Sequence, residues 1–136
     1  MSEIKLTIGD TSVLDVSVYK DSNVLDLANY LVLFTVKKPF YGAIGRNNPD
    51  DTKAVIAKNS QESGGIEKYG TGNVRITIGS DDTKDLVDGT YEYDLQISLP
   101  GEQDTVITVD SGNIIFSKEI TRRTVPLWAN VIIKLQ

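Results

Sequence analysis

The fold is decided by the stretch Gly89-Thr90-Tyr91-Glu92-Tyr93-Asp94-Leu95-Gln96-Ile97-Ser98-Leu99, in which apolar and polar residues alternate from Thr90 onward. This period of two is typical of a strand with one buried face, because successive side chains of a strand point to opposite sides. Turn-forming pairs bound the stretch, Asp88-Gly89 before it and Pro100-Gly101 after it. We therefore predict a half-buried antiparallel strand, whose inner face carries Tyr91, Tyr93, Leu95, Ile97 and Leu99.

The residues just upstream predict a corner that ties this strand to the core. Residues 80–87 have the composition of a capped single helical turn, and this turn directs Leu86 toward the core. A leucine, a glycine and a tyrosine then follow in order, as Leu86, Gly89 and Tyr91. This order resembles the tyrosine corner of immunoglobulin-like sandwiches, in which the phenol is hydrogen-bonded to backbone a few residues upstream. We predict that role for Tyr91, with Leu86 and Gly89 as structural residues.

Shorter alternating stretches predict further strands on both sides of the central one. A turn is predicted at Ser111-Gly112, the first strand is expected at a sheet edge, and the segment around Val24–Leu27 has no assignable pattern. Frequent turns and the lack of a long helical period predict an all-β fold. Specifically, we expect an immunoglobulin-like antiparallel β-sandwich of about seven or eight short strands, with one helical turn near residues 81–87. The sandwich is expected to span residues 1–122, followed by a C-terminal arm or added strand over 123–136. The other predicted strands cover residues 4–8, 14–18, 30–38, 54–58, 74–78, 105–109 and 114–118.

The composition argues against several classes of function. The chain contains no cysteine and no histidine, which removes thiol nucleophiles, disulfides and the commonest metal ligands and general base. We therefore predict that the chain is not an enzyme. Its formal net charge of −5 argues against nucleic-acid binding, which normally requires a basic face. We expect no membrane span and no secretory signal, because the apolar runs are too short for either.

An irregular loop that carries aromatic side chains is the first candidate for contact with a partner. It follows the predicted strand 30–38, whose outer face carries Leu31 and Leu33, so that strand is either covered on both faces or meets a partner. Loops of this length in a compact domain usually serve a function, and exposed aromatic residues favour docking. The alternative is a loop that folds its aromatic residues back onto the sandwich. The interface candidates in this loop are Phe40, Tyr41, Ile44 and Arg46.

The C-terminal tail is the second candidate for contact with a partner. It contains the only tryptophan of the chain and an apolar stretch that is typical of a strand. An exposed strand of this kind needs a pairing partner. It is expected to join either the domain's own sheet or the sheet of a neighbouring molecule. The interface candidates in and beside the tail are Arg122, Arg123, Leu127, Trp128, Val131, Ile133 and Leu135.

Other polar and aromatic clusters have simpler explanations than chemistry. Asp50-Asp51 and Asp81-Asp82 lack the spaced ligands of a calcium loop, and the second pair suits a helix N-terminus. Glu92 and Asp94 share one face of a strand, where a pair of carboxylates is usually solvated rather than catalytic. We assign no catalytic, metal-binding or cofactor-binding residue and expect no cofactor. A carbohydrate-binding or adhesion module remains the alternative, with an aromatic platform of Tyr41, Tyr69 and Trp128.

Several blocks of the sequence, taken in order, are similar to one known family. The blocks include YLVLFTVKK at residues 30–38, GNVRITI at 72–78, DGTYEYDLQI at 88–97 and TVDSGNIIFSKEITR at 108–122. Over roughly residues 12–122, this order resembles the immunoglobulin-like N-terminal domain of phage baseplate upper proteins and related small virion proteins. The resemblance implies a non-enzymatic protein that docks onto other virion proteins.

The resemblance also sets expectations about partners and location. It implies contacts with other virion proteins, and the apolar tail adds the expectation of contacts with copies of the same chain. The net charge and the short apolar runs, as argued above, leave nucleic acid and membrane out of the expected partners. The chain is then expected in the virion after synthesis in the host cytoplasm. Baseplate upper proteins continue with a helical linker and a receptor-binding module, whereas here only residues 123–136 follow the sandwich. We therefore expect a tail or baseplate adaptor, or a capsid decoration, rather than a protein that recognises the host.

Overall fold

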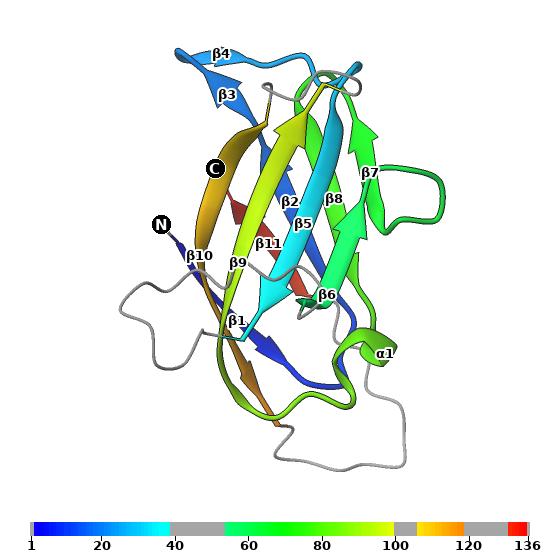
Figure 1. Cartoon of the computed structure of the whole chain (residues 1–136), viewed down its shortest axis with the longest axis vertical. Coiled ribbons are helices and arrows are strands. Elements are labelled where there is room, and N and C mark those ends of the chain that lie inside the picture. The colour runs from blue at the N-terminus through cyan, green and yellow to red at the C-terminus, as the bar shows by residue number, and fades with distance from the viewer. Residues whose placement is uncertain (1, 39–53, 100–105, 119–130, 136) are drawn as a thin grey trace.

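Two β-sheets pack face to face with an apolar core between them (Figure 1). The computed structural model describes residues 2–38, 54–99, 106–118 and 131–135. The five-stranded sheet has the order β1-β10-β9-β5-β6, and the four-stranded sheet has the order β11-β2-β8-β7. The strands of the first sheet are β1 (Ser2–Thr7), β10 (Ile107–Ser117), β9 (Gly89–Ser98), β5 (Leu31–Lys37) and β6 (Ala54–Asn59). Those of the second are β11 (Val131–Leu135), β2 (Ser12–Ser17), β8 (Asn73–Ile78) and β7 (Ile66–Tyr69).

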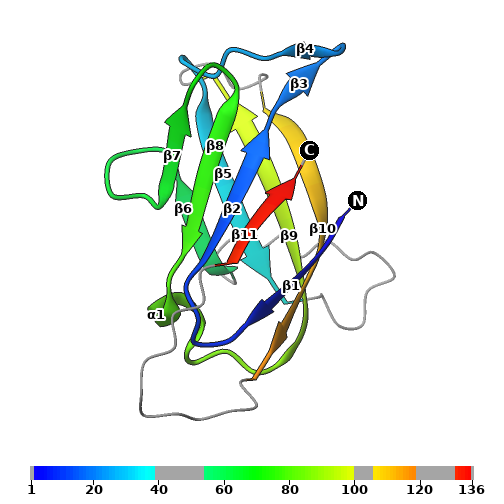
Figure 2. The same cartoon turned by 180° about the vertical axis from the view of Figure 1, so that it is seen from behind.

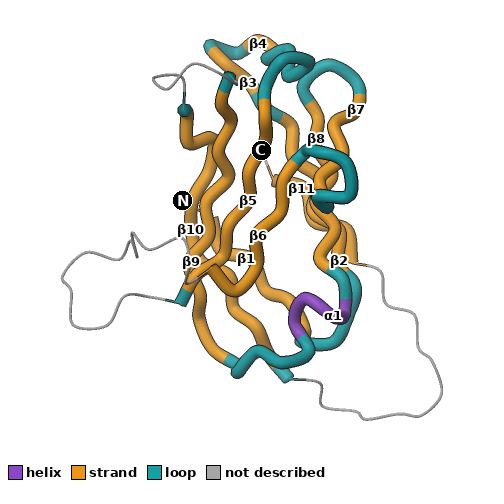
Figure 3. The backbone as a smooth tube through the Cα atoms, turned by 45° about the vertical axis from the view of Figure 1, so that its right-hand side comes forward, coloured by secondary structure: helices purple, strands orange, loops and turns teal. Residues whose placement is uncertain are grey.

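The order of the strands is that of an immunoglobulin-like sandwich. The pairs β5·β6, β7·β8 and β9·β10 are antiparallel neighbours within a sheet, while the connections β2 to β5, β6 to β7 and β8 to β9 cross between sheets. This alternation of hairpins and crossings is the Greek-key connectivity of that fold. The predicted all-β sandwich is therefore confirmed. Figure 3 shows that the described residues are strands and loops apart from one helical turn, α1 (Ser80–Thr83).

Two strand pairs at one flank of the sandwich are parallel, which the sequence did not predict. β1 pairs with β10 and β11 pairs with β2, each in parallel register. Both β1 and β11 are edge strands, so the expected edge position of the first strand is confirmed. Figure 2 shows both strands on the same flank of the sandwich, with the two chain ends close to them. Strand direction depends on the path of the connecting chain, which the alternation of side chains does not record.

Alternation along the strands builds the core. β5 and β9 bury every second residue, and β9 lies between β5 and β10, at the centre of its sheet. The side chains of Phe34 and Tyr93 pack with ring centroids 5.8 Å apart, and those of Tyr91 and Phe116 meet edge to face at 5.3 Å. The predicted central strand is thus confirmed.

The turn predicted at Ser111-Gly112 is wrong, because β10 continues from Ile107 to Ser117. Gly112 is buried and stands opposite Tyr93 of β9, whose phenol donates a hydrogen bond to the Asp110 carboxylate at 2.8 Å. The register shifts between Thr108 and Asp110, so the strand accommodates its irregularity there. A glycine inside a strand often marks an irregular or closely approached position, and here the ladder with β9 overrides the local turn preference.

The tyrosine corner is present as predicted. Tyr91 is 2% exposed and its phenol donates a hydrogen bond to the Val87 carbonyl at 2.7 Å. Leu86 is partly buried against the core. Gly89 has φ +148°, a conformation that residues with a Cβ rarely adopt. The corner therefore fixes the place where the chain leaves one sheet and enters β9.

Replacing Tyr91 with phenylalanine is expected to lower the free energy of unfolding by about 1–2 kcal/mol. The ring still fills its place, but the Val87 carbonyl loses the phenol donor. Urea unfolding with an unchanged m-value measures the loss. Tyr19→Phe is the control, because Tyr19 is 54% exposed and its change should stay within about 0.5 kcal/mol. Equal stability of the Tyr91→Phe variant and the wild type would contradict the role of the corner.

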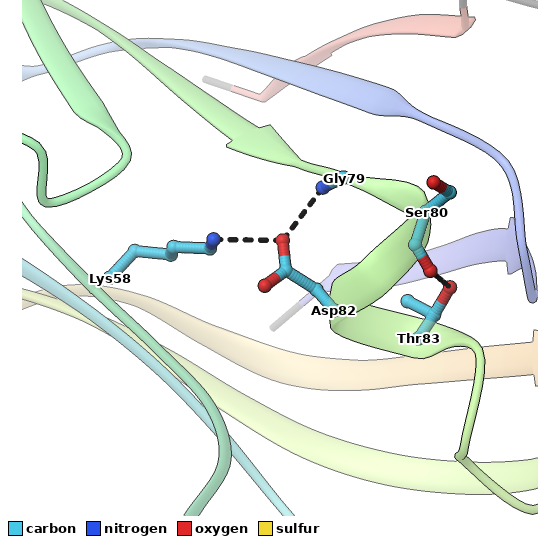
Figure 4. Close-up of polar contacts among 5 residues, drawn as sticks. All are labelled: Lys58, Gly79, Ser80, Asp82 and Thr83. Atoms are coloured by element: carbon cyan, nitrogen blue, oxygen red, sulfur yellow. Dashed lines mark hydrogen bonds and ion pairs between the residues drawn. The ribbon is translucent and has the colours of Figure 1, made fainter.

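The helical turn is shorter than predicted and begins after Gly79. The Asp82 carboxylate accepts a hydrogen bond from the Gly79 N–H at 2.7 Å, and this satisfies a donor at the start of α1 (Figure 4). The same carboxylate oxygen lies 2.8 Å from the Lys58 ammonium of β6. Thr83 is buried, and its hydroxyl accepts a hydrogen bond from the Gly9 N–H at 2.8 Å. Asp82 thus caps α1, in agreement with the helix-terminus interpretation, and also ties α1 to the first sheet.

A small hairpin of β3 (Tyr19–Lys20) and β4 (Asn23–Val24) precedes most of the segment without an assignable pattern. Asp21 and Ser22 both have positive φ, 53° and 68°, as the tight turns of β-hairpins require. Glycine supplies such angles most readily, and neither turn residue is glycine, so the hairpin signal in the sequence is weak. After the hairpin, Leu27 is 1% exposed and anchors the connection to β5.

Candidate interaction surfaces

Most of the predicted interface residues lie outside the described residues. This holds for both candidate segments, the loop after β5 and the tail before β11. Their proposed contacts therefore stay predictions. The residues concerned are Phe40, Tyr41, Ile44, Arg46, Arg122, Arg123, Leu127 and Trp128.

The backbone of β11 is placed, and it lies on the chain's own sheet. Val131 pairs with Ser12, Ile133 with Leu14 and Leu135 with Val16. Those three partners on β2 are buried. The three interface candidates of β11 thus occupy register positions opposite buried residues of β2, and Figure 2 shows β11 beside β2. Of the two pairings expected from the sequence, the structure has the one within the chain.

A row of alternating charges crosses the outer face of the four-stranded sheet. In register, Asp15 of β2 is opposite Arg75 of β8, and Arg75 is opposite Glu67 of β7. Opposite charges at directly facing positions stabilise a sheet, whereas like charges destabilise it. The charges of this face are therefore arranged in compensating positions within one chain.

Beside that row, Tyr69 of β7 packs beneath the guanidinium group of Arg75. The guanidinium carbon of Arg75 lies 4.7 Å from the centroid of the Tyr69 ring, and its Nε is 3.1 Å from the Asp15 carboxylate. The hydrogen bond to Asp15, followed by the charge of Asp15, raises the pKa of Arg75 above its ordinary value. The Tyr69 phenol also donates to Asp15 at 3.4 Å. Tyr69 is half-buried and one face of its ring is occupied by Arg75. The other two residues of the predicted aromatic platform, Tyr41 and Trp128, lie outside the described residues, so the platform stays a prediction.

The outer face of the five-stranded sheet mixes apolar and polar residues. Leu31 and Leu33 are half-buried there, and their register neighbours on β9 are Ser98 and Gln96. Asn59 of β6 stands on the other side of Leu33. The two leucines are therefore partly covered by polar neighbours rather than gathered into an apolar patch.

The two carboxylates of β9 lie on the same outer face. Glu92 stands in register between Asn113 and Lys37, and Asp94 accepts a hydrogen bond from the Gln96 amide at 3.4 Å. In the part of the chain that the structure describes, no group of three or more potential metal ligands gathers in one place. Asp82 is engaged in capping α1, and Asp81 lies 3.6 Å from Lys84.

The structure adds a surface that the sequence did not indicate. We call it the apolar end; it consists of Tyr19, Val24, Val106 and Ile107, which are 54%, 50%, 54% and 43% exposed. Tyr19 and Val24 are directly opposite each other in the β3–β4 hairpin. Val106 and Ile107 lie at the start of β10, at the same end of the sandwich as the hairpin (Figure 1). Period-two alternation could not reveal this surface, because only the folded chain brings the two segments to one end.

The apolar end is held in place by polar contacts at the base of the hairpin. The Val18 N–H donates to the Gly72 carbonyl at 2.8 Å, and the Leu27 N–H donates to the Thr71 carbonyl at 3.0 Å. The Lys68 ammonium donates to the carbonyls of Leu27 and Tyr30 at 3.1 and 2.8 Å. The hairpin is thus fastened to the β7–β8 turn while its own cross-strand pair stays exposed.

None of the described helices is long and apolar enough to cross a membrane. A comparison of the chain with models of known protein families and with curated protein sequences gave no match.

Proposed function

We propose that the chain is a non-enzymatic structural protein of a phage virion, which docks onto other virion proteins and onto copies of itself through protein–protein contacts. Its place is at the tail or baseplate, as an adaptor, or on the capsid, as a decoration. The chain is made in the host cytoplasm and acts in the assembled particle. The proposal rests on the sequence resemblance described above, and the structure adds one observation in its support.

That observation is the apolar end. The core itself is closed, with residues such as Val32, Phe34 and Leu14 fully buried, so the exposed apolar side chains are not the result of an incomplete core. Tyr19 and Val24 are directly opposite each other, and Val106 and Ile107 lie at the same end of the sandwich (Figure 1). Exposed apolar residues on neighbouring segments favour a site of protein contact. Aromatic and branched side chains on a small rigid domain suit docking, since they bury area with little loss of side-chain entropy.

The candidate loop and tail fit the same proposal. They contribute aromatic and arginine residues, which are the types enriched at the centres of protein interfaces. Many copies in one particle would let each weak contact count repeatedly, which raises the total affinity without a large single interface.

The test is incorporation into particles. Particles are produced by the phage that encodes the chain and purified on a density gradient, and the chain is quantified in them by mass spectrometry. We expect it to sediment with the particles at a fixed ratio to the major structural proteins. A chain that stays in the soluble fraction at the top of the gradient overturns the proposal.

A variant pair tests the apolar end within the same experiment. Tyr19→Ser combined with Val24→Ser is expected to reduce incorporation by about tenfold or more, because hot-spot residues carry most of the binding energy. Val87→Ser is the control. Val87 is 59% exposed, but it lies beside the tyrosine corner and is not part of the apolar end. Equal loss in both variants would assign the effect to solubility and not to docking at the apolar end.

A further inference from the structure

We propose that two copies of this chain join edge to edge through β11, in antiparallel pairing about a two-fold axis at Ile133, so that their four-stranded sheets form one continuous sheet. The inference deepens the proposed function and rests on it for its place in the particle. The pairing itself is a property of the isolated chain and is measured there.

The first argument is that β11 is an edge strand with a single described neighbour. Its described pairing is to β2 alone. Alternate residues of an edge strand direct their N–H and C=O groups away from the sheet, and these groups are ready to pair with another strand. Proteins protect such edges with charged residues, short length, irregular register or covering segments.

Among the described residues, the other three edges carry such protection, whereas β11 carries little. β1 presents the exposed residues Glu3 and Lys5. β7 has only four residues, including Glu67 and Lys68. At β6, the backbone of residues 64–65 closes over the end of the strand, through the Asn59 N–H bond to Gly64 and the bridge between Asn59 and Gly65. By contrast, β11 consists of Val-Ile-Ile-Lys-Leu, with one charge in five residues.

The second argument is that β11 is complementary to itself. An antiparallel pair centred on Ile133 places Val131 opposite Leu135 of the second copy, and Ile132 opposite Lys134. The positions in register with the buried residues of β2 (131, 133 and 135) then pair with the same set in the second copy. A shift of the pairing register by one residue would pair them with positions 132 and 134 instead. The two lysines avoid facing each other, and each keeps Asp15 of its own chain as register neighbour. No like charges are therefore directly opposed, and the symmetric contact closes on itself as two-fold interfaces do.

The occupant of the edge is thus a second copy, in preference to an unrelated strand. Val131, Ile133 and Leu135 are in register with the buried residues Ser12, Leu14 and Val16 of β2. A strand that joins β11 must continue that row with apolar residues, and β11 itself meets this requirement. At the remaining positions, Ile132 of each copy is opposite Lys134 of the other.

Charge substitutions at Ile132 give the first test, with sedimentation equilibrium of the purified full chain as the measurement. Ile132→Lys sets two lysines opposite each other twice per dimer and is expected to weaken the dimer by about tenfold, whereas Ile132→Glu sets glutamate opposite lysine and should strengthen it. The same changes at the exposed residue Thr77, which shares a register row with Ile132 through Val13, should leave the dimer unchanged. A monomeric wild-type chain, or equal effects of lysine and glutamate at position 132, overturns the pairing.

A single introduced cysteine gives the second test, because the chain has none of its own. Ile133 faces its own copy across the axis, where Cα atoms of paired strands lie within disulfide range. Ile133→Cys is expected to form a covalent dimer on mild oxidation, and Thr77→Cys to stay monomeric on non-reducing gels. Cross-linking at both positions, or at neither, contradicts the register. If pairing fails but the chain still sediments with particles, the inference falls and the proposed function stands. If the chain dimerises as described but is absent from particles, the pairing stands and the proposed function falls.

Discussion

Replacing Phe34 with alanine is expected to lower the free energy of unfolding by about 3–5 kcal/mol, the usual result of emptying a closed aromatic site in a core. Phe34 is completely buried on β5, between β6 and β9. The substitution also removes the packing between the Phe34 and Tyr93 rings, whose centroids are 5.8 Å apart. Since a domain of this kind is stable by only about 5–15 kcal/mol, the variant should unfold at a much lower urea concentration.

The neighbouring residue supplies the control for this prediction. Leu33→Ala removes an apolar side chain from the same strand but from its half-buried outer face. We expect it to cost about 1 kcal/mol, in proportion to the smaller apolar area removed from water. Similar losses for the two variants would mean that the two faces of β5 do not differ as the structure describes.

Replacing Gly72 with alanine is expected to destabilise the chain by about 3 kcal/mol and to detach the β3–β4 hairpin, because the added Cβ has no space. An added Cβ would lie 2.5 Å from Val24 Cγ1, 2.7 Å from the Leu25 carbonyl oxygen and 3.1 Å from the Val18 carbonyl oxygen. Two of these atoms belong to the backbone, so the hairpin itself must move. The Val18 N–H bond to the Gly72 carbonyl would be disturbed with it.

Hydrogen exchange measures where the effect of Gly72→Ala falls. We expect the amides of Leu25 and Leu27, which donate to Val18 and Thr71, to lose protection before the core strands do. Gly79→Ala is the control, because its Cβ would meet only the Asp82 carboxylate, at an ordinary 3.6 Å, and its φ of −80° suits any residue. Since the hairpin carries Tyr19 and Val24, the Gly72 variant should also lose incorporation into particles. Unchanged protection at Leu25 would contradict this account.

Some parts of the fold could be predicted from the sequence and others could not. The central strand β9 and the tyrosine corner follow from residues that are close in sequence. Tyr91 and Val87 are separated by four positions, and the burial of β9 alternates along one continuous stretch. Contacts between residues that are close in the chain, and burial that alternates along one stretch, can be recognised from the sequence.

The misjudged turn in β10 and the missed hairpin show the opposite case. Ser111-Gly112 has a local preference for a turn, but eight residues of β10 besides Gly112 pair with β9 and keep the strand extended. Asp21 and Ser22 adopt positive φ although neither is glycine. In both places contacts with distant segments outweigh a local preference of about 1 kcal/mol.

By itself the sequence determined the all-β class, the two faces of each long strand and the corner at Tyr91, because burial with a period of two is a local property of the chain. Only the tertiary structure decided that β1 and β11 pair in parallel at one flank, that β11 stands beside β2, and that Tyr19 and Val24 share an end with Val106 and Ile107. These arrangements join segments that are far apart in the chain. Which of them meet depends on how the two sheets close over one core, and no single stretch of residues contains that information.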